Sequence, residues 1–325
     1  MKENIIVTGA NGYLGFYVCK ELLKQGYHVI ALRYDHFASR IIQNENIEYI
    51  YCDITKDLIN NRELNKVVKE KKIAGILNLA ALLGSSDYNK NFEVNARGVQ
   101  VLMEFAKTIG VKRFIQISSV VVLKKIKGPY GETKLIGQDY LTKSEMDYTV
   151  FIPAMIMGPE SLGLNRVLKN VFRIPFIVPL IGNGLQTQHP IFVEDFAKYI
   201  VKSINETGAF RKTYQIAGDK VIPFKDFISL ILKIKKKKKV FVPIPPWFAK
   251  MLGMFFSKTQ KVPLFTAEHV KGVLQDSNLN TDSIKYDLGF QPTSFNVSME
   301  HCLNVIGNNW NKHLHPQDEK IINVP

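Results

Sequence analysis

The stretch TGANGYLG, residues 8–15, directly follows a short apolar run, NIIVT, and opens a segment with helical periodicity. Its glycines recur at every third position, as Gly9, Gly12 and Gly15. In such a loop the first glycine permits a tight turn, the second lets the backbone approach a pyrophosphate, and the third lets helix and strand pack closely. The helix N-terminus then offers unpaired N–H groups to the phosphates. This order of strand, loop and helix predicts a dinucleotide-binding α/β fold.

Short β-rich runs alternate with amphipathic stretches through the first half of the chain, which is typical of a parallel sheet with helices on both faces. Strands are expected near 4–8, 28–32, 48–52, 75–79, 113–118 and 148–152, and helices near 13–25, 62–70, 91–109 and 130–144. Gly26 and Gly110 stand where helix C-terminal glycines belong. We therefore predict a doubly wound parallel (Rossmann) sheet over residues 1–160, to which 186–222 return.

A smaller, mostly α-helical substrate domain is expected from residues 161–185 and 223–307, followed by a loose polar tail at 308–325. Helices are expected in it near 223–233, 266–275 and 295–307. The returning segment 186–222 is expected to hold a βα-like unit at 191–204. The stretch WFAKMLGMFF, within 243–256, has two interpretations. We favour the wall of an apolar substrate pocket over a membrane-surface helix, because only Lys250 and Lys258 lie within the helix.

The formal net charge is +14, from 43 Lys and Arg against 29 Asp and Glu. Five basic residues form the single run at 235–239, and the sequence shows no alternation of basic and aromatic residues typical of a nucleic-acid platform. A solvated loop beside a site for anionic ligands therefore fits better than nucleic-acid binding.

Three cysteines, Cys19, Cys52 and Cys302, are far apart in the sequence and have no CxxC or metal-ligand spacing. No metal site is expected, and this cysteine usage fits a reducing cytosol. The chain enters a strand at once, without a signal peptide, and has no run of about 18 apolar residues. We therefore expect a cytoplasmic protein.

The end of the second expected strand bears on which dinucleotide is bound. A carboxylate there binds the ribose 2′-hydroxyl of NAD, whereas an arginine accommodates the 2′-phosphate of NADP. The strand ends ALRYDHFASR, which places Arg33 at this position, Arg40 further along, and Asp35 within reach of the ribose. Because a guanidinium suits a phosphate, we expect NADP, with NAD as the alternative.

Tyr130 and Lys134 stand one turn apart on one expected helix face, shortly after Ser119 at the end of an expected strand. Hydride transfer between a carbinol and nicotinamide needs a group that takes or gives the hydroxyl proton. A tyrosine does this once its pKa falls from about 10 toward working pH. The Lys134 ammonium is expected to favour the phenolate, and the Ser119 hydroxyl to orient the substrate oxygen.

Eight ordered motifs together resemble those of the extended short-chain dehydrogenases/reductases of the epimerase/dehydratase type. They are TGANGYLG, CDI at 52–54, NLAA at 78–81, EVNARGV at 93–99, ISS at 117–119, YGETK at 130–134, IPAMIMGP at 152–159 and IGNGLQTQHPIFVEDFA at 181–197. The resemblance implies catalysis by Ser119, Tyr130 and Lys134, with Lys134 also holding the nicotinamide ribose. It also implies cofactor contacts from Gly9, Asn11, Gly12, Tyr13, Leu14, Gly15, Arg33, Asp53, Ile54, Leu79, Ala80, Ala81, Asn95, Tyr130, Lys134 and Pro153.

Two departures from the family pattern bear on the substrate. Gln188 and Ile152 stand where members that act on nucleotide sugars usually have arginines, and neither residue can replace a bidentate charged clamp. The segments expected to line the cleft, 155–164, 173–181 and WFAKMLGMFF, are also apolar. We therefore expect a largely apolar small-molecule ketone or alcohol. The alternatives are a nucleotide-sugar epimerase or dehydratase that works through a 4-keto intermediate, and a non-catalytic assembly or structural protein resembling the NADPH-binding accessory subunit of respiratory complex I. By analogy with relatives, helices 91–109 and 130–144 are candidates for a homodimer bundle.

Overall fold

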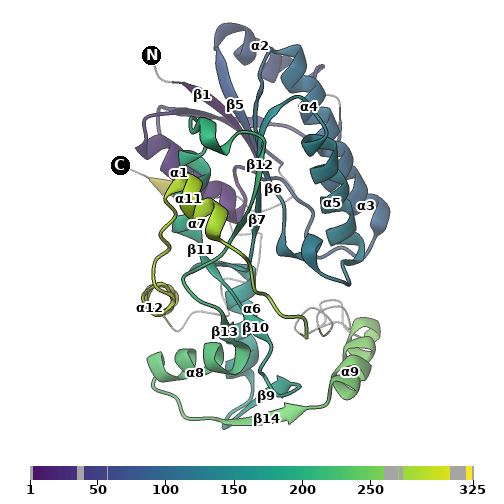
Figure 1. The fold of residues 1–325 in the computed structure, drawn as a ribbon, viewed down its shortest axis with the longest axis vertical. Helices are drawn as coiled ribbons and strands as arrows, with labels where there is room; N and C mark the ends of the chain where they lie inside the picture. Colours follow the sequence, from purple (N-terminus) through teal and green to yellow (C-terminus); the bar gives the residue numbers. More distant parts are fainter. Residues whose placement is uncertain are drawn as a thin grey trace.

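Seven parallel strands form the central sheet, in the order β4-β2-β1-β5-β6-β7-β12 (Figure 1). The computed structural model describes residues 3–34, 40–56, 58–259, 270, 274–307 and 320–323, with 255–259 and 320–323 as backbone only. The strands are β1 (Asn4–Thr8), β2 (His28–Arg33), β4 (Ile47–Tyr51), β5 (Ile73–Asn78), β6 (Arg113–Ile117), β7 (Asp147–Pro153) and β12 (Lys212–Ile216). The strand order reverses between β1 and β5, which confirms the predicted doubly wound sheet.

Helices cover both faces of this sheet (Figure 1). Helices α1 (Tyr13–Lys24) and α7 (Val193–Lys202) lie on one face, and α2 (Arg62–Glu70), α4 (Gly98–Thr108) and α5 (Gly128–Thr142) lie on the other. Successive strand residues alternate between the two cores, so that Ile5 and Val7 pack toward α1 and Ile6 packs toward α4. Gly26 and Gly110 follow α1 and α4 with positive φ angles of 84° and 71°, as predicted.

The long helix expected at 91–109 is interrupted. It consists of α3 (Tyr88–Phe92), a π-helical turn η1 (Glu93–Arg97), and α4. At this turn α5 approaches so closely that a Cβ atom added to Gly137 would lie 2.2 Å from the Asn95 carbonyl oxygen. Single π turns inside helices are frequent at functional sites. Periodicity alone could not show this turn, because the approach of α5 is a contact between residues far apart in the sequence.

The second half of the chain contains more strand than the sequence suggested. Short strands pair as β8 (Ile156–Met157) with β11 (Ile191–Phe192), β9 (Ile177–Ile181) with β14 (Val240–Ile244), and β10 (Thr187–Gln188) with β13 (Ile222–Pro223). The helices are α6 (Leu162–Arg173), α8 (Phe224–Ile234), α9 (Pro246–Thr259), α11 (Asp282–Leu288) and α12 (Phe295–Ile306), with 3-10 turns η2 (Val120–Leu123) and η3 (Thr207–Ala209) elsewhere. Prolines within β9 and β14 hid their strand pattern.

The expected loose tail is wrong in one place. Strand β15 (Lys320–Asn323) pairs in parallel with β3 (Arg40–Gln43), and its sequence KIIN holds two β-branched residues that favour a strand. The rest of 308–325 lies outside the described residues, as does most of the helix expected at 266–275. In the described part of the chain, every helix is too short or too polar to cross a membrane.

Candidate active site

A cavity of about 910 Å³ opens where the strands of the central sheet end. Its walls come from the residues that follow β1, β2, β4, β5, β6 and β7. This is the edge at which open α/β sheets bind ligands, next to the point where the strand order reverses. The volume is near the upper end of the range for small-molecule and cofactor sites.

The glycine loop forms one wall of the cavity and has the geometry of a phosphate cradle. Gly9 has a positive φ of 62°, and a Cβ atom added to Gly15 would lie 2.1 Å from the Gly9 carbonyl oxygen. Gly12 is the N-cap of α1, and no side chain in the described part of the chain caps that helix. The first amides of α1 therefore remain available to an anion. These features fit the pyrophosphate of a dinucleotide.

Asn11, Tyr13 and Leu14 line the cavity with the three glycines. The Tyr13 hydroxyl is buried and has no hydrogen-bond partner among the described residues. The Arg40 guanidinium lies 5.2 Å from the centre of the Tyr13 ring and forms an ion pair with Glu160. Arg40 does not line the cavity, and its charge is already paired, so it gives little support to a second phosphate contact.

Arg33 stands between two residues that line the cavity, Leu32 and Tyr34, but is not itself part of the lining. Successive residues of a strand point to opposite faces, which accounts for this difference. Asp35 lies outside the described residues. The structure therefore leaves the dinucleotide preference as a prediction.

The motifs after β4 and β5 supply the next part of the lining. Asp53 and Ile54 reach the cavity, and one Asp53 carboxylate oxygen accepts hydrogen bonds from the Thr55 amide (3.0 Å) and hydroxyl (2.7 Å). Leu79, Ala80 and Ala81 also line it. These local bonds and the short loops hold the strand ends in place.

A buried polar chain crosses three neighbouring strands beneath this wall. The Thr8 hydroxyl donates to the Asn78 side chain (2.6 Å), and Asn78 donates to Gln116 (2.8 Å). Gln116 donates in turn to the Ile117 carbonyl oxygen (3.1 Å), while the Ala80 amide donates to Thr8 (3.2 Å). Because each buried group has a partner, the chain fixes the relative positions of the strand ends.

Ser119, Tyr130 and Lys134 all line the same cavity, as their motifs predicted. Ser119 is the N-cap of η2, and its hydroxyl accepts a hydrogen bond from the Val121 amide (3.3 Å). Tyr130 and Lys134 lie one turn apart in the first half of α5. The Lys134 ammonium is 3% exposed and donates to the Ile117 carbonyl oxygen at 2.5 Å. This bond joins Lys134 to the buried polar chain.

The protonation of the pair differs from the expectation. Burial raises the pKa of Tyr130 to about 12, and a hydrogen bond with Ser119 offsets only part of that rise. Burial also lowers the pKa of Lys134 to about 8. The expected lowering of the tyrosine pKa is therefore wrong for the protein alone, because desolvation outweighs the neighbouring groups and the ammonium points toward β6.

Pro153 and Asn95 differ in their positions. Pro153 lines the cavity, whereas Asn95 does not. Asn95 lies in the π turn, where its side chain accepts a hydrogen bond from the Leu82 amide (3.1 Å) and contacts the Thr133 hydroxyl (3.3 Å). It thus ties the loop after β5 to α5, and in this structure it positions other residues.

Several lining residues were not predicted. They are Leu32, Tyr34, Cys52, Thr55, Leu82, Leu83, Asn89, Lys90, Glu93, Val94, Ile117, Ser118 and Ala154. Many adjoin predicted positions at strand ends, and that adjacency was the available signal. Ser118 is 4% exposed, and its hydroxyl has no hydrogen-bond partner among the described residues. Glu93 and Val94 come from the π turn and belong to the EVNARGV motif, whereas Asn89 and Lys90 come from α3 and lie outside every motif.

One of the three expected apolar segments lines the cavity, since Met155, Ile156 and Leu162 of 155–164 form part of its apolar side together with Leu82 and Leu83. The other two are wrong, because no residue of 173–181 and none in the described part of α9 lines it. Ile152 is buried within β7, and Gln188 lies in β10, where it pairs with Ile222 of β13. Neither residue lines the cavity.

Comparison with known proteins agrees with this geometry. Residues 5–217 match the model of the NAD dependent epimerase/dehydratase family. The NADH-ubiquinone oxidoreductase 40 kDa subunit of Neurospora crassa is 23% identical over 97% of this chain and 82% of its own length. The photosystem II assembly factor Ycf39 of Guillardia theta is 26% identical over 89% of this chain and 90% of its own.

Solved structures share the fold. An epimerase from Methanothermobacter thermautotrophicus is 21% identical, covers 96% of this chain and 94% of its own, and has a TM-score of 0.74. The UDP-glucose 4-epimerase of Thermotoga maritima is 19% identical and has a TM-score of 0.72. The match covers 94% of this chain and 99% of the epimerase chain. Together with the family match over residues 5–217, the glycine cradle and the motif residues gathered in one cavity, these findings show that the chain belongs to the NAD dependent epimerase/dehydratase family.

Proposed function

We propose that this chain is an NAD(P)-dependent oxidoreductase that transfers hydride at a carbonyl or carbinol of a small, largely apolar molecule. The observation that carries the proposal is the convergence of Ser119, Tyr130 and Lys134 on the cavity that contains the glycine cradle. These residues come from two elements, η2 and α5, which meet only in the folded chain. A non-catalytic dinucleotide site has no need of this arrangement.

The nicotinamide would supply or accept the hydride, and the protein's residues would handle the proton. At neutral pH Tyr130 is a neutral phenol, since its pKa is about 12, and so it suits the donation of a proton to a carbonyl oxygen. The Ser119 hydroxyl, which shares a hydrogen bond with Tyr130, would orient that oxygen. Lys134, with a pKa of about 8, is mainly cationic at pH 7 and would stabilise the phenolate left behind.

The lining supports an apolar substrate. Among the described lining residues the only cations are Lys90 and Lys134, and Lys134 is committed to the Ile117 carbonyl oxygen. A nucleotide diphosphate needs a stronger clamp than one exposed lysine. Five large apolar side chains, those of Leu82, Leu83, Met155, Ile156 and Leu162, instead face the remaining space.

Two other functions have specific support. Similarity to the 40 kDa subunit and to the assembly factor favours a dinucleotide-binding structural or assembly role. Structural likeness to the UDP-glucose 4-epimerase favours a nucleotide-sugar reaction through a keto intermediate. Retention of Tyr130 and Lys134 in the cavity argues against the first, and the scarcity of cations argues against the second.

The test begins with mass spectrometry of molecules that co-purify with the full chain. Thermal unfolding is then measured with NADPH or NADH, and NADPH oxidation is followed with a panel of apolar ketones and aldehydes. We expect stabilisation by NADPH, the dinucleotide that the sequence predicts, and turnover of at least one ketone. Stabilisation by NADH alone would overturn the cofactor preference. Cellular function that survives Tyr130→Phe but is lost when the glycine loop is blocked would favour the assembly role.

A further inference from the structure

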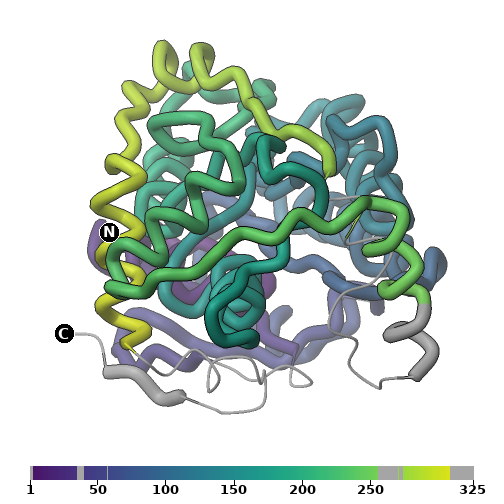
Figure 2. The backbone as a smooth tube through the Cα atoms, turned by 90° about the horizontal axis from the view of Figure 1, so that it is seen from below, coloured from purple at the N-terminus to yellow at the C-terminus, as the bar shows by residue number. Residues whose placement is uncertain are grey.

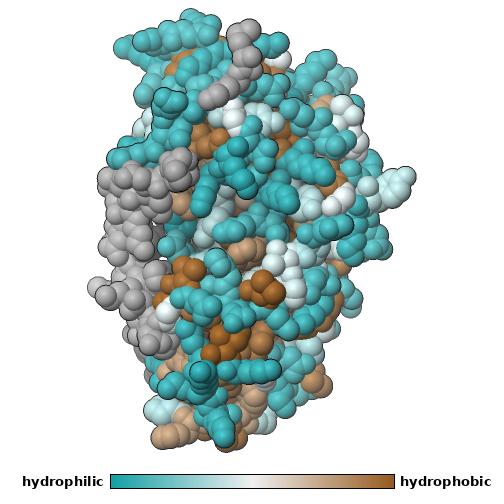
Figure 3. Space-filling model, turned by 90° about the vertical axis from the view of Figure 1, so that its left-hand side faces the viewer, coloured by the Kyte–Doolittle hydropathy of each residue, from teal (hydrophilic) through white to brown (hydrophobic). Residues whose placement is uncertain are grey.

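The end of the substrate domain formed by β14, the turn before β9 and the start of α9 exposes many large apolar side chains. Figure 2 looks directly at this end, where β14 crosses in front and continues into α9. The exposed side chains there are Ile174 (40%), Phe176 (82%), Val240 (67%), Val242 (38%), Trp247 (69%), Met251 (47%) and Met254 (48%). We call these seven residues the apolar patch. In the side view of Figure 3, tan and brown surface likewise appears in the lower part of the molecule.

The patch residues in β14 and α9 are regularly spaced along the sequence. Val240 and Val242 are two residues apart and therefore lie on the same side of β14. Trp247, Met251 and Met254 follow each other at intervals of four and three residues and therefore lie on one side of α9. Apolar residues with this spacing normally face a core. Here they are exposed, which is typical of a surface that contacts another apolar phase.

Phe176 gives independent evidence that outward placement is favoured. Its φ angle is 53°, in the left-handed region that bulky residues rarely adopt. The turn is held by hydrogen bonds from the Val240 amide to the Phe176 carbonyl oxygen (2.8 Å) and from the Ile177 amide to the Pro175 carbonyl oxygen (2.6 Å). A strained backbone that presents an exposed ring is characteristic of a functional contact.

The charge around the patch has one sign. Segments 161–185 and 227–259, which carry all seven patch residues, contain eleven basic residues and no acidic residue. Lys236, Lys237 and Lys238 are exposed beside β14, and Lys250 is exposed on α9. Lys235 and Lys239 are used differently, because they donate to backbone carbonyl oxygens of Gly307 (2.6 Å) and Ile174 (2.6 Å). The run thus anchors itself at both ends and presents its middle to solvent.

We propose that this end of the molecule docks onto the surface of an anionic phospholipid membrane. Tryptophan and other large apolar side chains bury themselves at the boundary between headgroups and acyl chains, and neighbouring lysines attract anionic headgroups. An apolar patch surrounded by one sign of charge fits that surface better than a typical protein interface, in which lysine is depleted. The proposal concerns a surface remote from the catalytic cavity and is independent of the reaction catalysed there.

The test uses the full chain and vesicles of phosphatidylcholine alone or with phosphatidylglycerol, compared by flotation. We expect binding to the anionic vesicles at low salt and at least tenfold less binding to the neutral ones. In a Trp310→Phe background, Trp247 is the only tryptophan, so its emission should shift to the blue on binding and be quenched by brominated lipid chains. The double change Phe176→Ser and Trp247→Ser should lower binding at least tenfold.

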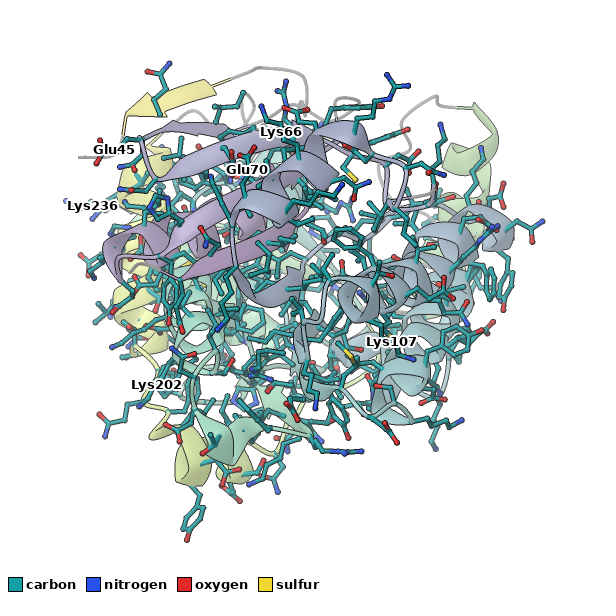
Figure 4. The ribbon with its side chains drawn as sticks, turned by 90° about the horizontal axis from the view of Figure 1, so that it is seen from above. Glu45, Lys66, Glu70, Lys107, Lys202 and Lys236 are labelled. Carbon is teal, nitrogen blue, oxygen red and sulfur yellow. The ribbon has the colours of Figure 1, made fainter. Side chains whose placement is uncertain are left out.

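Matched variants separate specific docking from general charge attraction. The triple change of Lys236, Lys237 and Lys238 to Gln should weaken binding by roughly tenfold to a hundredfold, because each basic residue near an anionic surface contributes about fivefold. Its control changes Lys66, Lys69 and Lys107 to Gln on α2 and α4, two of which Figure 4 labels. Tyr286→Ser, at a side chain 91% exposed on α11, is the apolar control. Both controls should bind like the parent.

Three outcomes would overturn the proposal. One is equal binding to neutral and anionic vesicles, or none to either. Another is a loss of binding in the controls as large as in the patch variants, which would indicate charge attraction alone. The third is a concentration-dependent dimer that the double change of Phe176 and Trp247 dissolves while vesicle binding is absent, which would assign the patch to a second copy of the chain.

Discussion

At the cavity lined by the glycine loop, a methyl group added to Gly15 would meet the Gly9 carbonyl oxygen at 2.1 Å, whereas at the far end of the C-terminal region the Phe176 side chain is 82% exposed. The cavity is confined by backbone atoms and by a buried polar chain that ends at Lys134. The apolar patch has neither feature. The difference teaches that one region is built to hold atoms in fixed positions, while the other presents side chains outward.

The largest expected effect is on catalysis at the confined end. Tyr130→Phe removes only a hydroxyl, whose hydrogen-bond partner is Ser119, and should lower kcat by about a thousandfold with the fold intact. Steady-state kinetics with the ketone found in the panel measures the loss. Dinucleotide affinity, measured by fluorescence titration, should change by less than about threefold. A variant that retains more than a tenth of the parent's kcat would contradict the role of Tyr130 as acid/base.

The next effect is on stability, and it compares two glycines, one in the first turn of α1 and one just after its last residue. Gly15→Ala should destabilise the fold by about 3 kcal/mol and abolish dinucleotide binding, because the added Cβ meets backbone that cannot move aside. Gly26→Ala is the control, since no atom of the described residues lies within 4 Å of its added Cβ and its positive φ is what opposes the change. It should cost about 1 kcal/mol. If urea unfolding gave the same loss in the free energy of unfolding for both variants, the glycine loop would not be tightly packed.

Lys134 gives a pH-dependent test of the same end. Its folded pKa of about 8 is below the usual lysine value, so unfolding takes up a proton between about pH 8 and 10 and stability rises with pH there. Lys134→Met should remove that rise and stabilise the fold at pH 7 while abolishing activity. The Ile117 carbonyl oxygen would still accept from Gln116.

Urea unfolding at pH 7 and 9.5 measures this effect. The stability advantage of Lys134→Met over the parent should shrink by about 2 kcal/mol between the two values. Lys107→Met, at an exposed lysine on α4, serves as the control and should show no such change. An advantage independent of pH would mean that Lys134 is not desolvated in the folded state.

The smallest effect is expected at the exposed end, and its sign is opposite to that of Gly15→Ala. Phe176→Asn should stabilise the fold by roughly 0.5 to 1 kcal/mol, because Asn tolerates the left-handed backbone and the ring has little packing to lose. Tyr286→Asn, equally exposed but on a helix, should be neutral or slightly destabilising. If thermal unfolding shows a loss at Phe176 larger than at Tyr286, the ring packs more than its exposure indicates.

Much of the confined end could be predicted from the sequence, because its motifs depend on local chemistry. The glycine spacing requires a particular backbone at residues 9–15, and most predicted contact positions follow directly from strands whose carboxyl ends meet at one edge. Arg33 and Asn95 are the exceptions that do not line the cavity. Arg33 lies on the other side of its strand, and Asn95 is used to join a loop to α5.

The exposed end was harder to anticipate. The sequence shows that WFAKMLGMFF is apolar and that five lysines precede it, but not which side of the helix is covered. Only the tertiary structure places its described residues away from the cavity and leaves Trp247 exposed. The pairing of β9 with β14 across more than fifty residues is likewise non-local, so no local pattern could reveal it.

The sequence by itself determined the parallel sheet, the dinucleotide cradle and the identity of the Ser119, Tyr130 and Lys134 group, since each depends on residue type and spacing along a short segment. The tertiary structure decided the protonation of that group, because desolvation depends on everything packed around it and raises the Tyr130 pKa while lowering that of Lys134. It also decided which apolar residues line the cavity and which face solvent, because burial is a property of the whole packed chain.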